Sequence, residues 1–256
     1  MKPKYWVPAL ERAHAILAQI ASEPGSLRLI DLATRLDINK SSMFSLLHTM
    51  ETIGWIVKEK GDTYMLGPAL GAFGAAFSNQ FQLQEAFRLE AISTVQKIEE
   101  TVQLGVLDGN QVIYLGKEEC IAPIRLVSNP GMRFPAHATA LGKVQLAQHD
   151  YQTLQQLYPD GQLEERTPFT VKHLSELWLQ LQEIHKLGYA FDREEAVQGF
   201  FCIAAPIFNH EGRIIGAVSV SMVETSWKEK WEMAIREILQ LALRISSRAG
   251  FVRKGE

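Results

Sequence analysis

The feature that most constrains the fold is a series of three short amphipathic segments at the start of the chain. Apolar residues recur at helical spacing in residues 8–21, 30–36 and 43–53, which predicts three helices. Pro24 breaks the first segment and Gly54 stops the third, so the helices are separate and short. Such helices must bury their apolar faces against one another, which predicts a small three-helix unit.

A hairpin follows these helices. Residues 55–58 and 63–66 have the composition of strands, and the turn Glu59-Lys60-Gly61-Asp62 joins them. Three helices and a hairpin in this order are typical of a winged helix-turn-helix, whose second motif helix enters the DNA major groove. The same geometry also occurs in domains that pack against protein, so the pattern by itself leaves both kinds of partner open.

The third helix would be the recognition helix. If Met43, Leu46, Leu47, Met50 and Ile53 face the core, the residues left to contact bases are Ser41, Ser42, Phe44, Ser45, His48 and Thr49. Phe44 could touch a thymine methyl or be a partly buried packing residue. Phosphate contacts would come from Lys40, Lys58 and Lys60.

Charge and composition limit the classes of protein to which this chain can belong. Residues 1–67 carry eight Lys/Arg and seven Asp/Glu, a net +1 within a chain of net charge −3, so charge alone does not indicate DNA binding. No apolar run reaches the roughly 18 residues of a membrane span. The two cysteines, Cys120 and Cys202, lie far apart. These features predict a cytoplasmic protein without a membrane segment, a structural zinc ribbon or a cofactor.

The rest of the chain predicts a larger second domain. We expect residues 1–67 to be the winged domain, the small-residue segment 68–81 to be a linker helix, and residues 82–256 to be the second domain. Helical patterns in this domain cover residues 83–101, 138–147, 172–187 and 228–248. Strand patterns cover residues 102–107, 112–117, 124–127, 189–192, 202–207 and 214–223. Short turns between strands imply antiparallel pairing, so the fold class is α+β.

One strand of this domain carries two hydroxyls. Period-two alternation places Ser219 and Ser221 on the same face of an apolar strand, where buried hydroxyls require partners. Residues 137–143 are a mostly small-residue segment that enters a helix after Pro135, and free N–H groups there can hold a carboxylate. Taken singly, each such residue is more often an ordinary packing or backbone-satisfied residue.

Several segments resemble the IclR family of bacterial transcriptional regulators, and the resemblance covers nearly the whole chain. They are "PALERAHAIL", "LATRLDINKSSMFSLLHTM", "YMLGPAL", "LGVLDGNQVIYLGK", "IRLVSNPGMRFPAHATALGK", "GYAFDREEAVQGFFCIAAPIF" and "GAVSVS". The resemblance implies a winged helix-turn-helix, a GAF-like effector domain, and a homodimer or dimer of dimers on operator DNA. It also implies an effector site at Ala140, Leu141, Asp192, Cys202, Ser219 and Ser221.

The chain departs from the family pattern at a few positions. Asp37 stands where the family commonly has Gly, and Asp tolerates left-handed backbone better than most residues. Ser45 stands where the family commonly has Arg, which affects operator choice. Phe201 replaces the Arg that commonly precedes Cys202, which removes an expected ion-pair partner of Glu194 or Glu195.

Two other functions are consistent with these residue types. Cys202, His137 and Asp192 could form a thiol catalytic set or a metal site, although no sequence spacing typical of either occurs. A GAF-type sensor could instead signal through protein partners. The favoured prediction is a transcriptional regulator with no catalytic residues and no metal. Its effector would be a small carboxylate held by the backbone of Ala140 and Leu141 and by hydrogen bonds donated from both serines, and a hydroxy or oxo acid with an apolar body would suit this arrangement.

Overall fold

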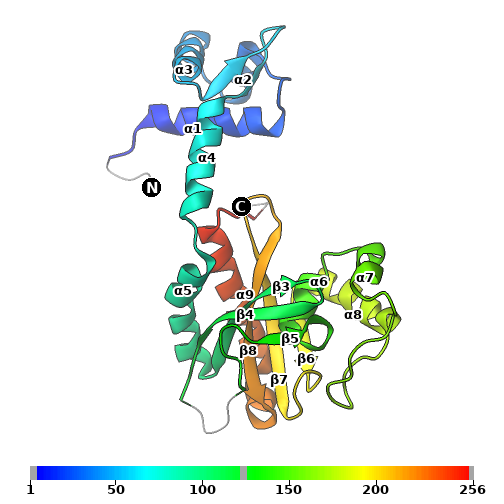
Figure 1. The fold of residues 1–256 in the computed structure, drawn as a ribbon. Helices are drawn as coiled ribbons and strands as arrows, with labels where there is room; N and C mark the ends of the chain where they lie inside the picture. Colours follow the sequence, from blue (N-terminus) through cyan, green and yellow to red (C-terminus); the bar gives the residue numbers. More distant parts are fainter. Residues whose placement is uncertain (1–4, 122–125, 254–256) are drawn as a thin grey trace. The chain divides into compact units, whose positions relative to one another are not determined.

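The computed structural model describes residues 5–121 and 126–253, without the side chains of residues 77–80 (Figure 1). The chain divides into two compact units, Met1–Gln80 and Phe81–Glu256. Among the described residues, no helix is both long and apolar enough to span a bilayer.

The first unit contains the three predicted helices and the hairpin. Its elements are α1 (Pro8–Ser22), α2 (Leu29–Arg35), α3 (Lys40–Thr52), β1 (Ile56–Lys58), β2 (Tyr64–Leu66) and α4 (Pro68–Gln80). One apolar cluster, which includes Ile16, Leu32 and Leu47, joins the three helices to the hairpin. The winged helix-turn-helix prediction is therefore confirmed in fold.

The prediction that Ile53 faces the core of the first unit is wrong. Ile53 is 48% exposed, whereas Met43, Leu47 and Met50 are buried and Leu46 is half-buried. Ile53 caps the C-terminus of α3, beyond the last turn that contacts the core. Helical periodicity therefore fails at the helix end.

The turn before α3 has the backbone expected from its residues. Asp37 adopts a left-handed φ of 51°, which Asp tolerates. Asn39 then caps α3, because its side chain accepts a hydrogen bond from Ser42 N at 2.8 Å.

The second unit is built on one antiparallel sheet with six strands in the described residues, in the order β5-β4-β3-β8-β7-β6. The strands are β3 (Thr101–Asp108), β4 (Gln111–Glu118), β5 (Arg133–Pro135), β6 (Ala190–Arg193), β7 (Phe200–Phe208) and β8 (Ile214–Val223). The central pair, β3 and β8, joins segments more than one hundred residues apart in sequence, with Gln103 opposite Ser219. The α+β class is confirmed.

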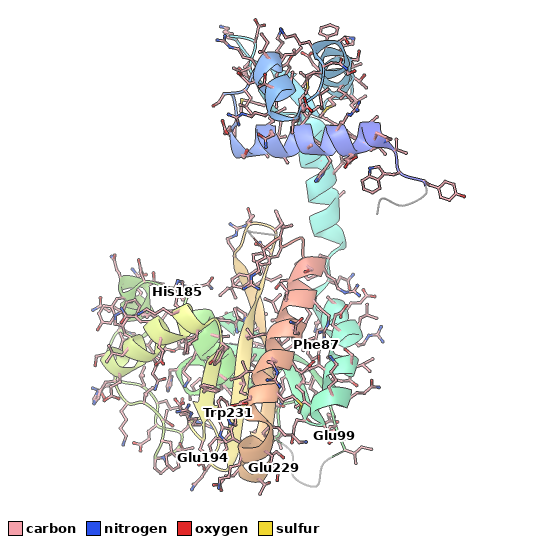
Figure 2. The ribbon with its side chains drawn as sticks, turned by 180° about the vertical axis from the view of Figure 1, so that it is seen from behind. Phe87, Glu99, His185, Glu194, Glu229 and Trp231 are labelled. Carbon is pink, nitrogen blue, oxygen red and sulfur yellow. The ribbon has the colours of Figure 1, made fainter. Side chains whose placement is uncertain are left out.

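Helices cover both faces of this sheet. Figure 2 views the face packed by α5 (Leu83–Ile98) and α9 (Glu224–Arg248), which bury one apolar cluster against it. The opposite face packs against α6 (Ala140–Leu146) and α8 (Leu174–Leu187), and these helices enclose a second cluster. The two hydroxyl positions of β8 belong to this second face, together with Cys202.

Short elements were the least predictable part of the second unit. The 3-10 helix η1 (Ala136–Ala138) occupies the start of the predicted helix 138–147, so α6 begins at Ala140. Strand β5 and helix α7 (Tyr151–Leu157) were not predicted. Of the predicted strand 124–127, residues 124 and 125 lie outside the described residues, and Leu126 and Val127 are not in a strand. Elements of three to seven residues give few repeats of a periodic pattern, so periodicity indicates some of them, such as α2, and misses others.

Candidate functional site

A small cavity lies between α6 and the sheet. Five of the six predicted effector residues line it, namely Ala140, Leu141, Asp192, Cys202 and Ser219. The sixth, Ser221, is not among the lining residues but places its Oγ 3.3 Å from Cys202 Sγ. The cavity volume is about 10 Å³, close to the minimum that one water needs. A larger occupant therefore requires the lining side chains to move.

Strand register explains why these side chains meet. Asp192 of β6 lies opposite Cys202 of β7, which lies opposite Ser221 of β8. Two residues along, Ser219 of β8 lies opposite Gln103 of β3. Since side chains two residues apart share a face, the polar groups form two adjacent rows across the sheet.

The backbone at the start of α6 supplies hydrogen-bond donors. Thr139 caps the helix through its Oγ1, which accepts from Gly142 N at 3.0 Å. No described residue accepts a hydrogen bond from the N–H of Ala140 or Leu141, and both residues are buried at the cavity. A Cβ on Gly142 would lie 2.2 Å from the carbonyl oxygen of Ala136, so only glycine allows η1 to hold this turn in place.

Gln103 is a polar residue of this site that the sequence did not reveal. Its side chain is completely buried, and its Oε1 accepts hydrogen bonds from Ser219 Oγ at 3.1 Å and Ser221 Oγ at 3.2 Å. The serine hydrogens are thus used within the protein, whereas the sequence predicted that a ligand would receive them. The signal that could have found Gln103 is a lone amide in the apolar strand "VQLGV".

Asp192 is a buried carboxyl at the cavity wall. Its Oδ1 accepts hydrogen bonds from Glu195 N at 2.7 Å and Ala196 N at 3.3 Å. Burial raises the pKa of Asp192 to about 7, although the nearby Lys143 ammonium opposes the rise. Asp192 therefore changes its charge near neutral pH.

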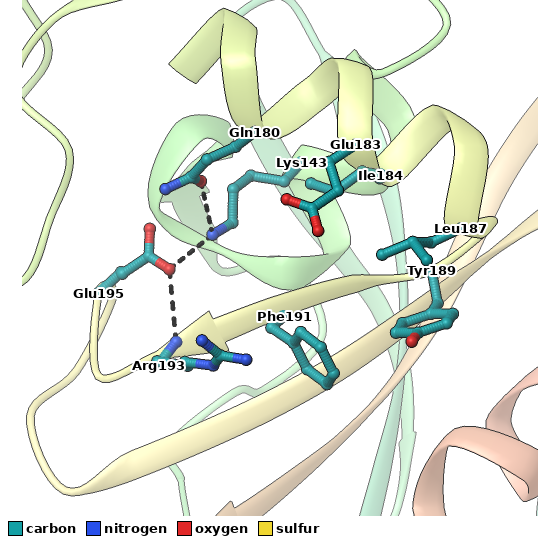
Figure 3. Close-up of a pocket in the computed structure, with 9 residues that line it drawn as sticks. All are labelled: Lys143, Gln180, Glu183, Ile184, Leu187, Tyr189, Phe191, Arg193 and Glu195. Atoms are coloured by element: carbon teal, nitrogen blue, oxygen red, sulfur yellow. Dashed lines mark hydrogen bonds and ion pairs between the residues drawn. The ribbon is translucent and has the colours of Figure 1, made fainter. Parts of the chain in front are cut away.

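A buried ion pair lies beside this wall. Lys143 Nζ of α6 is 2.6 Å from Glu195 Oε1 and 3.2 Å from Gln180 Oε1 of α8. Figure 3 marks both contacts with dashed lines. Lys143 is 2% exposed and Glu195 7%. The pair also contributes to a separate cavity of about 280 Å³ beside α8 and β6. Lys143, not a residue at position 201, is thus the ion-pair partner of Glu195, while Glu194 accepts a hydrogen bond from Gly199 N.

The residues of the alternative catalytic set are not arranged for catalysis. His137 Nε2 lies 2.9 Å from the carbonyl oxygen of Glu164, and its ring packs edge-on against Tyr158; no hydrogen bond joins it to Cys202 in the described structure. Burial raises the pKa of the Cys202 thiol well above its usual value, which opposes the thiolate that a nucleophile needs. In residues 5–121 and 126–253, no group of three or more His, Cys, Asp or Glu could hold a metal ion.

Helix α3 presents the predicted recognition residues to solvent. Phe44 is 62% exposed, and its ring stacks on that of His48 with 6.0 Å between centroids. Phe44 is therefore available at the surface and is not a buried packing residue. Ser41 and Ser45 are exposed too, whereas Ser42 is half-buried. Ser45 Oγ donates to Ser41 O at 3.1 Å, so a base must compete with this bond.

The predicted phosphate contacts are not equivalent. Lys40 and Lys60 are exposed. Lys58 Nζ is 2.7 Å from Asp62 Oδ1 across the wing turn, and this ion pair raises the pKa of Lys58. An exposed pair is weak, but it offsets the charge that Lys58 presents to a phosphate.

Comparison with known proteins identifies both units. The family model for the IclR helix-turn-helix domain matches residues 9–60, and the model described as the bacterial transcriptional regulator IclR C-terminal domain matches residues 80–247. The second match alone covers more than half of the chain.

Individual proteins align over most of their length. The transcriptional regulator XynR of Escherichia coli is 33% identical over 245 residues, which cover 95% of this chain and 97% of XynR. The regulator BhcR of Paracoccus denitrificans is 34% identical over 217 residues, covering 84% and 77%. The crystal structure of the Agobacterium tumefaciens repressor BlcR has 27% identity and a TM-score of 0.81, covering 96% and 99%. The chain belongs to the IclR family of bacterial transcriptional regulators.

Proposed function

We propose that this regulator binds operator DNA in the cytoplasm through α3 and the wing, and that a small carboxylate bound in the cavity of the second unit controls this activity. The observation that carries the proposal is that no residue described by the structure accepts a hydrogen bond from the N–H of Ala140 or Leu141 at the cavity. Buried donors without partners cost about 1–3 kcal/mol each, and a carboxylate would satisfy both.

The other walls of the cavity suit such a ligand. Tyr114 and Phe134 line it and pack edge-to-face, with ring centroids 5.4 Å apart, which suits an apolar or aromatic body. Asp192 would repel an anion when ionised, but burial keeps a substantial fraction of it neutral at pH 7. Because the closed cavity is so small, binding must displace lining groups, and this displacement is the means by which we expect the ligand to change the conformation of the domain.

The experiment that tests the function is selection of genomic DNA fragments by the purified full-length protein. We expect a few sites with pseudo-palindromic sequence to be enriched, and the acids handled by the products of neighbouring genes to change their occupancy. A protein that enriches no sequence above background would instead fit a sensor that acts through protein partners.

A carboxylate should bind in preference to its uncharged analogue. For any acid that changes operator occupancy, we expect the corresponding primary amide to bind at least tenfold more weakly by calorimetry. The reason is that an amide oxygen is a weaker acceptor for the N–H groups of Ala140 and Leu141 than a carboxylate. Equal affinities for acid and amide would show that the anionic group does not lie at these donors.

Helix α4 supports assembly as a homodimer or a dimer of dimers. Residues 71–76 are all exposed although none is charged, and Phe73 is 61% exposed. A second copy of the chain would cover this surface and would also double the phosphate contacts of a winged unit whose net charge is only +1. Light scattering on free protein and on its operator complex tests the assembly. Full affinity in a complex of one monomer with one operator would contradict it.

Substitutions in the first unit should separate affinity from specificity. We expect Lys40→Ala to weaken binding by a similar factor on every DNA sequence, because Lys40 would contact phosphate. The slope of log affinity against log salt concentration should also become shallower by about one. Ser45→Ala and His48→Ala should instead change the preferred bases. Fluorescence anisotropy at several salt concentrations and selection from a randomised operator library measure the two effects.

The control for these variants is Lys172→Ala, which removes an exposed lysine from the second unit. It should leave DNA affinity and base preference unchanged. Equal, sequence-independent losses for Lys40, Ser45 and His48 variants would contradict the assignment of α3 as the recognition helix.

A further inference from the structure

The hydrogen bonds around Gln103 run in one direction. Ser219 and Ser221 both donate their single hydroxyl hydrogen to Gln103 Oε1. Since Ser221 has no second hydrogen, its oxygen can only accept in the 3.3 Å contact with Cys202 Sγ. The hydrogens of both serines therefore point along the sheet toward the amide oxygen of Gln103.

The orientation of the Gln103 amide follows from its other neighbour. Gln103 Nε2 lies 3.4 Å from Ser128 Oγ, and Ser128 in turn donates to the carbonyl oxygen of Leu126 at 3.5 Å. Ser128 has used its hydrogen and can only accept from Gln103, so the NH₂ group must face Ser128. This leaves the amide oxygen to face Ser219 and Ser221.

This arrangement decides what Ser219 offers to the cavity. Ser219 lines the cavity, and with its hydrogen committed to Gln103 its oxygen presents only lone pairs there. Ser219 of β8 therefore accepts hydrogen bonds at the cavity, whereas the backbone of Ala140 and Leu141 donates them.

We propose that Gln103, which does not line the cavity itself, positions the Ser219 hydroxyl as an acceptor and thereby selects carboxylates that carry a hydroxyl donor over the corresponding oxo acids. The inference rests on the proposed carboxylate function of the same cavity. A ligand hydroxyl donates to Ser219 Oγ, whereas a keto oxygen at that place meets another acceptor and leaves both oxygens without a hydrogen. The preference for the hydroxy acid should be about tenfold or more.

The test uses two acid pairs of matched skeleton, lactate with pyruvate and mandelate with phenylglyoxylate, each enantiomer of the hydroxy acid being measured separately. Calorimetry on the full-length protein should show that, in a pair that binds, one enantiomer of the hydroxy acid binds about tenfold or more tightly than the oxo acid. Gln103→Met keeps the volume of the side chain but frees both serine hydroxyls to rotate. In this variant the ratio of the affinity for the hydroxy acid to the affinity for the oxo acid should fall to near one.

Two further variants make the result specific. Gln84→Met replaces a glutamine whose Nε2 donates to the carbonyl oxygen of Leu115 outside the cavity lining, and it should keep the ratio of the unmodified protein. Ser219→Ala removes the acceptor itself and should also bring the ratio to near one. This variant tests the proposal if thermal melting shows that Gln103→Met does not fold. A loss of general packing would lower both affinities together and leave the ratio unchanged.

The outcomes distinguish this inference from the function on which it rests. An unchanged ratio in Gln103→Met, or equal binding of hydroxy and oxo acids by the unmodified protein, would overturn the role of Gln103 and leave the carboxylate site intact. Binding of none of these acids would count against the carboxylate site and would overturn the inference with it.

Discussion

Lys143→Met should lower the free energy of unfolding of the second unit by about 3–5 kcal/mol. The substitution removes the ammonium 2.6 Å from Glu195 Oε1 and leaves a carboxylate that is only 7% exposed without a counter-charge. After the substitution Glu195 Oε1 keeps only the hydrogen bond from Arg193 N at 3.4 Å, and Glu195 Oε2 has no hydrogen-bond partner in the described structure, so no other cation compensates the charge. Chemical denaturation followed by circular dichroism measures the loss.

Two controls show whether burial is the cause. Lys97→Met removes a lysine that is largely exposed and pairs with Glu237 at 3.0 Å, so the cost should stay below about 1 kcal/mol. Lys143→Met combined with Glu195→Leu removes both charges and should recover most of the lost stability. If Lys143→Met costs no more than Lys97→Met, the buried pair does not hold α6 against the segment that follows β6.

Carboxylate binding should weaken about tenfold for each pH unit above about 7. Burial raises the pKa of Asp192 to about 7 in the free protein, and an anionic ligand favours its neutral form further. Below pH 7 the carboxyl is already protonated and affinity should be nearly constant. Above pH 7 each binding event must take up a proton, so calorimetry in buffers of different ionisation enthalpy should detect that uptake.

The other ionisable groups that face Asp192 do not produce the same pH dependence of carboxylate binding. Burial raises the pKa of the Cys202 thiol and of the Tyr114 hydroxyl, so both stay protonated to higher pH, and Lys143 and Glu195 form an ion pair. Asp192→Asn should therefore abolish the pH dependence between 7 and 9 while the acid still binds. The same slope in this variant would assign the proton to another group.

Much of the architecture could be predicted from local sequence. The helical spacing of residues 8–21 and 43–53 and the breaks at Pro24 and Gly54 indicated the three-helix unit, because each helix contains several turns of the repeat. Alternation in the strand with Ser219 and Ser221 correctly placed both hydroxyls on one face. Five effector residues named from the family resemblance also meet at one cavity.

Local patterns failed where elements are short or end. Ile53 fits the period of α3, yet it lies at the cap and is exposed. Helix α6 begins two residues later than predicted because η1 precedes it. The start of α6 is set by the close approach of Gly142 to the backbone of Ala136, which no periodicity describes.

The sequence by itself determined which faces are apolar and which strands carry polar groups, since these depend on side chains a few residues apart. Only the tertiary structure decided the partners. Gln103 and Ser219 are 116 positions apart, and Lys143 and Glu195 are 52 apart; they meet through strand register and helix packing. Lysine is rarely buried, so nothing local predicts that Lys143 lies in the core. The direction of the serine hydrogen bonds likewise depends on Gln103, because a hydroxyl points to whichever acceptor the fold brings near it.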